Sequence, residues 1–174
     1  MTRSPLHTGG CQCGAVRYAL YAEPEKPSIC HCRMCQKAFG AYYAPLASVA
    51  LADFAWTRGA PKHFRSSSIV RRGFCAECGT PLTYEFDGED QVAVSLGSLD
   101  DPAAVRPVIQ YGIEGMVPWV HELGPLPGSV TEDDMPPGSL DNLVVYQHPD
   151  HDTAEWPPAA LGRVPGRTGG EAGR

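Results

Sequence analysis

The sequence has no apolar run that approaches the roughly 20 residues needed for a membrane-spanning helix. Its first ten residues contain no apolar segment of the kind that marks a secretory signal. An excess of positive charge is also missing, because 14 Lys and Arg stand against 20 Asp and Glu, which gives a formal net charge of −6. These absences argue against a membrane protein, against secretion and against non-specific binding to nucleic acid, which needs a basic surface.

Long amphipathic helices are not predicted either. No segment repeats apolar residues at the 3.6-residue helical period, and 19 Gly and 17 Pro interrupt almost every stretch. Residues 16–20, 82–86 and 92–96 instead alternate between apolar and other side chains, as half-buried strands do. Asp87-Gly88 lies between the last two of these stretches and is a hairpin signal. We therefore predict a mainly β chain.

The length of 174 residues is enough for one domain with its own core. We expect several short antiparallel sheets, a further strand within 108–113, and little helix beyond Arg33–Phe39. We place the domain at residues 5–147. Residues 148–174 are rich in Pro and Gly and have few side chains able to bury surface, so they are interpreted as a flexible tail in which His148 is solvated. Arg71-Arg72 forms a small basic patch that we interpret as a solvated strand face, the alternative being that it receives an anionic substrate.

All seven cysteines fall in three tight clusters, which are Cys11-x-Cys13, Cys30-x-Cys32-x-x-Cys35 and Cys75-x-x-Cys78. Neighbouring thiolates can converge on one metal ion but cannot easily bridge each other. The spacing therefore predicts a compact zinc-binding β fold rather than a disulfide framework. Clustered free thiols without an export signal also predict a reducing, cytoplasmic location.

The number seven divides into four plus three. Structural zinc prefers four closed ligands, whereas catalytic zinc keeps three protein ligands and an open position. Cys11, Cys13, Cys75 and Cys78 can close a structural site, and Gly14 and Gly79 follow the two pairs where such a loop turns back. Cys30, Cys32 and Cys35 are left as a three-thiolate site. The alternative is that one of these three is an inert buried thiol, or that all seven serve only structure.

The clusters and their surroundings resemble the family of glutathione-dependent formaldehyde-activating enzymes, which includes centromere protein V. The matching segments are Gly10-Cys-Gln-Cys-Gly-Ala-Val-Arg-Tyr18, Cys30-His-Cys-Arg-Met-Cys35, Phe54-Ala-Trp-Thr-Arg-Gly59, Arg71-Arg-Gly-Phe-Cys-Ala-Glu-Cys-Gly-Thr-Pro-Leu82 and Gly97-Ser-Leu-Asp-Asp-Pro102. The resemblance covers roughly residues 9–127 and does not reach the tail.

The resemblance implies a structural zinc on Cys11, Cys13, Cys75 and Cys78 and a catalytic zinc on Cys30, Cys32 and Cys35, of which we expect the second to be the more labile. It implies glutathione as the small-molecule thiol and formaldehyde as the electrophile, joined as S-hydroxymethylglutathione by a carbon–sulfur lyase working in reverse. One departure is Gln110, which stands where the family pattern has a histidine after Pro107. Glutamine does not titrate near neutral pH, so the substrate could differ.

The three-thiolate cluster carries the chemical hypothesis. Metal coordination strips the proton from an incoming thiol, and the resulting thiolate is a nucleophile for an electrophilic carbon. Three thiolate ligands weaken the Lewis acidity of zinc, which favours activation of the thiol over polarisation of the carbonyl. His31, between two proposed ligands, is a candidate proton carrier. The alternatives are a non-catalytic zinc-binding module and a redox or metal-responsive thiol protein. The sequence does not give the oligomeric state.

Overall fold

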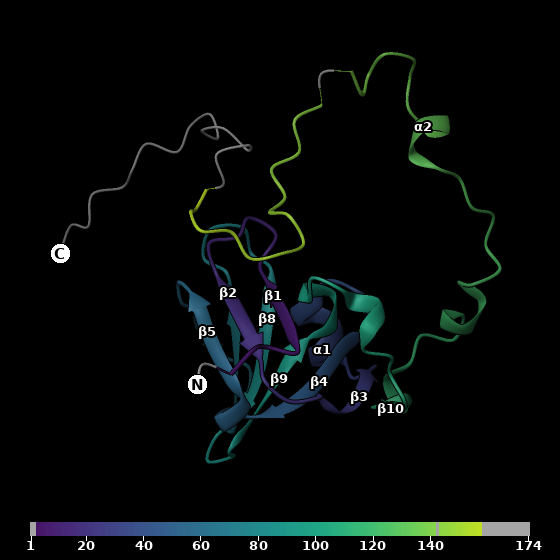
Figure 1. The fold of residues 1–174 in the computed structure, drawn as a ribbon. Coiled ribbons are helices and arrows are strands. Elements are labelled where there is room, and N and C mark those ends of the chain that lie inside the picture. The colour runs from purple at the N-terminus through teal and green to yellow at the C-terminus, as the bar shows by residue number, and fades with distance from the viewer. Residues whose placement is uncertain (1–2, 142, 158–174) are drawn as a thin grey trace.

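The computed structural model describes residues 3–141 and 143–157, and in this part of the chain ten strands form two sheets (Figure 1). The strands are β1 (His7–Gly10), β2 (Arg17–Leu20), β3 (Glu25–Cys30), β4 (Ala44–Ala50), β5 (Phe54–Arg58), β6 (Lys62–Arg65), β7 (Val70–Phe74), β8 (Pro81–Phe86), β9 (Gln91–Ser95) and β10 (Ile109–Tyr111). The α-helices are α1 (Arg33–Phe39) and α2 (Thr131–Asp134), and short 3-10 turns cover Leu51–Asp53, Leu96–Ser98, Pro102–Ala104, Ile113–Gly115 and Val120–Glu122. The predicted mainly β fold class is confirmed.

The smaller sheet has the order β1-β2-β5, and the larger has the order β10-β3-β4-β9-β8-β7-β6. Neighbouring strands are antiparallel except for β10, which pairs in parallel with β3. Because β10 returns beside β3, it lies next to the strand that ends at Cys30. This parallel pairing is a long-range feature that the local sequence pattern did not predict.

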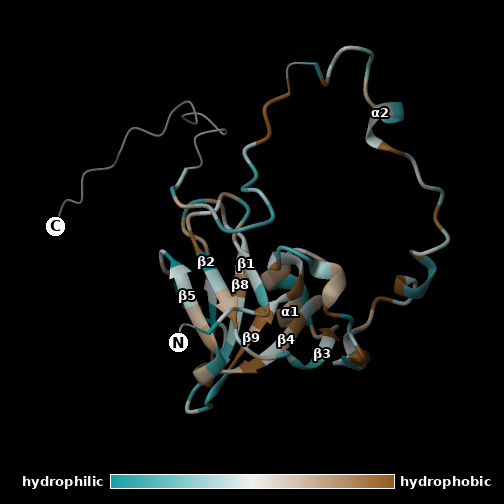
Figure 2. Ribbon diagram, in the orientation of Figure 1, coloured by the Kyte–Doolittle hydropathy of each residue, from teal (hydrophilic) through white to brown (hydrophobic). Residues whose placement is uncertain are grey.

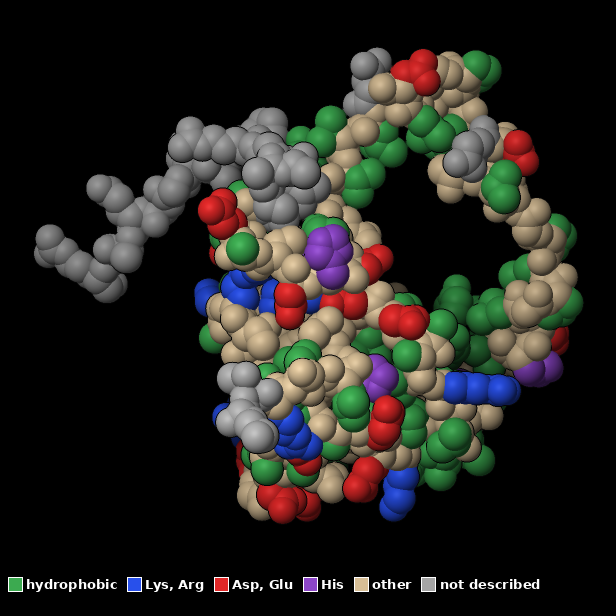
Figure 3. Space-filling view, in the orientation of Figure 1, with side chains coloured by type: hydrophobic (Ala, Val, Ile, Leu, Met, Phe, Trp, Pro, Cys, Tyr) green, Lys and Arg blue, Asp and Glu red, His purple; other side chains and the backbone are tan. Residues whose placement is uncertain are grey.

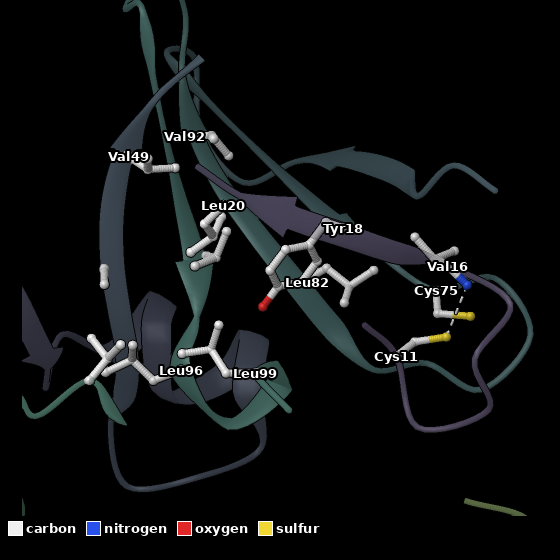
Figure 4. Packing of buried hydrophobic residues seen from close by; sticks show 13 residues of the cluster. Cys11, Val16, Tyr18, Leu20, Val49, Cys75, Leu82, Val92, Leu96 and Leu99 are labelled. Carbon is white, nitrogen blue, oxygen red and sulfur yellow. Dashed lines mark hydrogen bonds between the residues drawn. The ribbon is translucent and has the colours of Figure 1, made fainter. Parts of the chain in front are cut away.

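The main core lies where the strands of the smaller sheet pack on the larger one (Figure 4). Tyr18 and Leu20 of β2 are fully buried and join Val49 of β4 and Val92 of β9 in one cluster. Side chains alternate between the two faces of a strand, so Ala93, next to Val92, instead packs against a second and smaller cluster with Cys35 and Leu46. The larger sheet thus carries the core on one face and the three-cysteine cluster on the other.

The local predictions in this body are confirmed. Helix α1 spans Arg33–Phe39 as expected, and it ends at Gly40, whose φ of 61° gives the left-handed cap that glycine permits. Strands β8 and β9 form the predicted hairpin around Asp87-Gly88, and Gly88 has a φ of 78°. A positive φ at such a turn is favoured by glycine, which has no Cβ to clash.

After β10, the turn at Ile113–Gly115 and Trp119 still contact the body, through the Gln36–Gly115 hydrogen bond and the Tyr42–Trp119 ring contact. Beyond them an arm of residues 123–141 and 143–147 arches outward through α2 and returns (Figure 1). Many apolar side chains of this arm are exposed, including Leu143, Val144 and Val145, which lie in a hydrophobic stretch of Figure 2. The space-filling view shows the arm standing clear of the body over most of its length (Figure 3). None of the helices in the described residues is long and apolar enough to cross a membrane.

The chain that follows the arm docks on the loop after β1. The backbone N–H of His148 donates to the Gln12 carbonyl at 2.7 Å, and the indole N–H of Trp156 donates to the Cys13 carbonyl at 2.6 Å. His148 is only 3% exposed, so its interpretation as a solvated residue is wrong. Hydrogen bonds to the loop after β1 hold His148 in this buried position, and no local sequence pattern predicts such long-range contacts. Residues 158–174 of the predicted tail lie outside the described residues, and the domain boundary at residue 147 stays a prediction.

Candidate metal centres and the adjoining pocket

Cys11, Cys13, Cys75 and Cys78 come together from two loops, one after β1 and one between β7 and β8. Their sulfur atoms all lie within 4.8 Å of one another. The Sγ atoms of Cys11 and Cys13 are 3.6 Å apart, and those of Cys13 and Cys75 are 3.8 Å apart. A tetrahedron with Zn–S bonds of about 2.3 Å has edges of about 3.8 Å. The four sulfurs therefore already have the spacing of a closed zinc site.

Each loop turns back through a glycine. The N–H of Gly14 donates to the Cys11 carbonyl and that of Gly79 to the Cys75 carbonyl, both at 2.9 Å. Both glycines have a positive φ, 76° for Gly14 and 80° for Gly79. The turns also point backbone N–H groups at sulfur, as from Val16 to Cys11 Sγ at 3.3 Å. Such donors favour the thiolate form of the cysteine.

The electrostatics of this group differ between its members. Burial raises the pKa of Cys11 and of Cys75 above the ordinary thiol value. For Cys78, burial also acts upward, but hydrogen bonds from Thr80 and Cys13 outweigh it and lower the pKa to about 6. The Cys78 sulfur lies 3.1 Å from the Thr80 hydroxyl. One thiolate is thus available near neutral pH before any metal arrives.

Cys30, Cys32 and Cys35 meet at the junction of β3 and α1, and their sulfurs also lie within 4.8 Å of one another. Cys30 is the last residue of β3, Cys32 is the N-cap of α1, and Cys35 lies in the first turn of that helix. The Cys32 sulfur accepts a hydrogen bond from the Cys35 backbone N–H at 3.4 Å. The strand end and the helix start therefore fix all three side chains on a stretch of six residues.

The three thiols of this second group have unequal electrostatic surroundings. Burial raises the pKa of Cys30 to about 12, and it also raises the pKa of Cys35, although the Arg72 guanidinium opposes that rise. For Cys32, burial acts upward but hydrogen bonds from the Cys35 and Met34 backbone and from neighbouring thiols lower the pKa. Cys32 is therefore the first of the three to become a thiolate.

Both groups have the donor chemistry of a zinc site, because clustered thiolates select soft or borderline metals. Among the described residues, no fourth His, Cys, Asp or Glu joins the three-cysteine group. The sequence analysis divided the cysteines in the same way, and the structure brings together each set that was predicted to share an ion. That these cysteines bind zinc, and that the second ion is catalytic, stay predictions.

A pocket of about 550 Å³ opens beside the three-cysteine group, and all three cysteines line it. Tyr84 and Tyr111 line it from β8 and β10, and further lining side chains are Met34, Leu46, Phe86 and Glu89. This volume is in the range of small-molecule sites, which are mostly apolar with a few polar groups. The arrangement can hold a small ligand against the sulfurs.

His31 does not line this pocket. Its ring is 1% exposed, lies 5.6 Å from the Tyr43 ring, and places Nε2 at 2.9 Å from the Gln110 side-chain oxygen. That oxygen accepts, so Nε2 carries the proton in this contact, and the buried Nδ1 has no hydrogen-bond partner. Gln110, which departs from the family pattern, therefore serves as the contact from β10 to the loop that holds Cys30 and Cys32.

Like Tyr84 and Tyr111, Arg72 is a pocket residue that the sequence analysis missed. It was interpreted as part of a solvated strand face, which is correct for Arg71 but wrong for Arg72, because Arg72 is 3% exposed. Successive residues of a strand face opposite sides, so only one of two neighbouring arginines could be solvated in a sheet covered on one face. The alternation of buried and exposed side chains expected along β7 could have predicted that one of the two arginines is buried. Two adjacent charged residues made that alternation hard to recognise in the sequence.

The chain is similar to known proteins, and the family match covers the region that holds all seven cysteines. A sequence model of the glutathione-dependent formaldehyde-activating enzymes matches residues 6–114. A protein of Schizosaccharomyces pombe that bears the name uncharacterized lyase is 28% identical over 82 residues, which are 47% of this chain and 59% of that protein. This chain thus spans less than two thirds of that relative. A solved Rhodobacter sphaeroides protein is 22% identical, and the match covers 59% of this chain and 98% of that protein with a TM-score of 0.48.

Proposed function

Because this chain belongs to the family of glutathione-dependent formaldehyde-activating enzymes, we propose that it is a zinc-dependent carbon–sulfur lyase that acts on a thiol adduct. We further propose glutathione as the thiol and formaldehyde as the electrophile, joined as S-hydroxymethylglutathione. The lyase name of the Schizosaccharomyces pombe relative agrees with the broader reaction class.

The observation that carries the proposal is the contrast between the two cysteine groups. Four sulfurs surround one position completely, whereas three sulfurs surround the other and face a pocket of about 550 Å³. A closed four-thiolate site is typical of structural zinc, and a site with three protein ligands is typical of catalytic zinc. When bound by Cys30, Cys32 and Cys35, zinc would supply an open coordination position at which a thiol loses its proton.

The residues around the three sulfurs have separate roles in the proposed reaction. Backbone N–H groups and the Arg72 guanidinium donate to the sulfurs and hold them in place. Tyr84 and Tyr111 give the pocket aromatic walls beside the reacting thiol. In the synthetic direction the thiol sulfur forms a bond to the aldehyde carbon, and the carbonyl oxygen gains a proton. The reverse reaction breaks that carbon–sulfur bond and returns the thiol.

The proposed part of His31 in proton transfer is less well supported than the cysteine roles. The ring is buried away from the pocket lining and is engaged by Gln110. We propose that His31 orients the Cys30–Cys32 loop. Solvent in the open pocket then takes up the thiol proton and supplies the proton that the carbonyl oxygen gains.

One observation favours the redox alternative as the second candidate. The lowered pKa of Cys32, with burial opposed by stronger hydrogen bonds, makes a thiolate that an oxidant could attack. The neighbouring sulfurs of Cys30 and Cys35 are close enough to resolve such an oxidised thiol. Under this alternative, mild oxidant should form a reversible disulfide within the cluster, and glutathione with formaldehyde should give no product.

The proposal is tested by measuring zinc per chain in the purified protein and in a C30S/C32S/C35S variant. Glutathione binding to both is followed by calorimetry, and product formation with formaldehyde by NMR. We expect two zinc ions to fall to one and both glutathione binding and product formation to disappear. K37A, on α1 but outside the pocket lining, is the control and should match the unaltered protein. One zinc in both proteins, with no glutathione binding, would refute the proposal.

A further inference from the structure

Arg72 places a buried positive charge directly beside the three-cysteine group. Its Nη2 donates to Cys35 Sγ at 3.3 Å, and its Nε donates to the Ser66 hydroxyl at 3.0 Å. The guanidinium carbon lies 4.6 Å from the centre of the Tyr84 ring, which is a cation–π distance. The remaining nitrogen, Nη1, is buried and has no hydrogen-bond partner.

Among the described residues, no carboxylate forms an ion pair with Arg72. The neighbouring Arg71 shows the ordinary arrangement, since its Nε lies 2.7 Å from a Glu85 carboxylate oxygen at the surface. An arginine cannot release its proton in a protein, and a buried guanidinium without a counter-charge is strongly destabilising. The group able to supply negative charge that is in hydrogen-bond contact with Arg72 is the Cys35 sulfur. The three-cysteine group, once its thiols are deprotonated, is therefore the counter-ion of Arg72.

The charge balance of the loaded site follows from this pairing. A divalent ion with three thiolates has one net negative charge, which Arg72 neutralises. A further thiolate ligand adds a second negative charge to the group, whereas a neutral ligand adds none. Attraction to a cation a few ångströms away, at an effective dielectric constant of about 20, is large enough to change binding tenfold or more.

We propose that Arg72 is a positioning residue that, through Cys35, makes the three-cysteine site selective for anionic thiolate ligands over neutral ones. The inference rests on the proposed function in one respect, namely that a thiol is the ligand of this site. Selectivity of this kind matters for a thiol adduct, because a free thiolate is charged and its hydroxymethyl adduct is neutral. Arg72 would thus retain the thiol before reaction and favour release of the adduct.

The test uses the cobalt(II)-loaded protein, whose sulfur-to-cobalt absorption changes when a ligand binds. 2-Mercaptoethanol, which binds as a thiolate, and imidazole, which binds neutral, are titrated against the unaltered protein, R72Q and R72K at one fixed pH. Gln keeps an N–H donor without the charge, and Lys keeps the charge without the planar fork. R71Q, at the exposed neighbouring position, is the matched control.

We expect R72Q to bind 2-mercaptoethanol about tenfold more weakly while its imidazole affinity stays within about twofold of the unaltered value. R72K should keep most of the affinity for the thiol, and R71Q should change the affinity for neither ligand. If R72Q weakened the binding of both ligands equally, Arg72 would only maintain the shape of the site. If R72Q weakened the binding of neither ligand, Arg72 would have no part in ligand selectivity. Both results would overturn the proposal.

If R72Q does not retain cobalt, R72K carries the test through the ratio of thiol to imidazole affinity. That ratio should stay within about threefold of the unaltered protein, and a tenfold fall would contradict a role for the charge. These titrations use no aldehyde and no turnover. Failure of the formaldehyde reaction would therefore refute the proposed function without affecting the selectivity measurement. Loss of selectivity in these titrations would refute the role of Arg72 without affecting the formaldehyde reaction.

Discussion

At the scale of single residues, a buried ion pair joins Arg17 and Asp100. The Arg17 side chain is 2% exposed, and its two terminal nitrogens donate to the two Asp100 oxygens at 2.7 and 2.5 Å. The Thr8 hydroxyl donates to the same carboxylate at 2.5 Å. A buried, bidentate pair of this kind is costly to break from one side, because the remaining charge stays buried.

Replacing Asp100 by Asn should lower the free energy of unfolding by about 2 kcal/mol at pH 7, less than for a fully isolated pair because Asp152 also contacts Arg17. Urea unfolding in the presence of zinc measures this value. D101N is the control: Asp101 caps a 3-10 turn, and Asn caps equally well. A loss below about 0.5 kcal/mol for D100N would show that the pair is not a net stabiliser.

The same pair gives a pH dependence with a definite sign. Burial acts to raise the pKa of Asp100, but the hydrogen bonds from Arg17 and Thr8 lower it below its ordinary value. The stabilisation is therefore present above the unfolded value of about 4 and is lost as the pH falls through the folded value. The difference between the unaltered protein and D100N should shrink accordingly below about pH 4.

At the scale of elements, the two cysteine loops are built alike but are placed differently. A Cβ added at Gly14 would strike the His148 ring, whereas one added at Gly79 would meet nothing within 4 Å. Both glycines have the left-handed φ that disfavours other residues. Comparing substitutions at Gly14 and Gly79 therefore separates two free-energy costs, that of an unfavourable backbone conformation and that of displacing a packed side chain.

G79A should lower the free energy of unfolding by about 1 kcal/mol, the cost of alanine at a positive φ. G14A should cost about 3 kcal/mol, because the His148 ring must also move. Thermal unfolding at equal zinc content measures both, and adding H148A to G14A should recover most of the excess. Equal costs for the two glycines would show that His148 does not press on the first loop.

At the scale of the whole molecule, the segment after the arm ties the end of the described chain to the four-cysteine loop (Figure 1). The His148 ring uses its Nδ1 proton towards the Pro149 carbonyl at 2.7 Å. Its Nε2 lies 3.2 Å from an Arg58 nitrogen, which can only donate, and 3.0 Å from the hydroxyl of Thr153, whose proton goes to the Glu155 carbonyl. The ring is therefore held in the neutral form, and protonation would set two cations against each other.

Burial, together with Arg17 and Arg58, lowers the pKa of His148 below the ordinary value of 6.5. The undocked segment consequently binds a proton more readily, so docking should weaken as the pH falls below about 6.5. Hydrogen exchange in peptides covering residues 143–157, corrected for intrinsic rates, should show protection falling over that range. H148Q should remove the pH response and H151Q, at an exposed position, should keep it. A response unchanged in H148Q would exclude His148 as the titrating group.

Much of this molecule is determined by the sequence alone. Alternating apolar residues predicted the strands around Tyr18, Tyr84 and Val94, and Asp87-Gly88 predicted the hairpin, because these patterns depend on near neighbours. The cysteine clusters predicted which sulfurs would gather, because chelation needs short spacing within each cluster and leaves few ways to combine the clusters.

Only the tertiary structure decided the partners of the charged groups. Arg72 of β7 meets Cys35 of α1, Arg17 of β2 meets Asp100 in the loop after the Leu96–Ser98 turn, and His148 meets the loop at Gln12. These contacts join residues 37, 83 and 136 positions apart, the last being the difference between 148 and 12. Sequence patterns report the conformation and burial of nearby residues, whereas the choice between distant partners follows from strand order and packing.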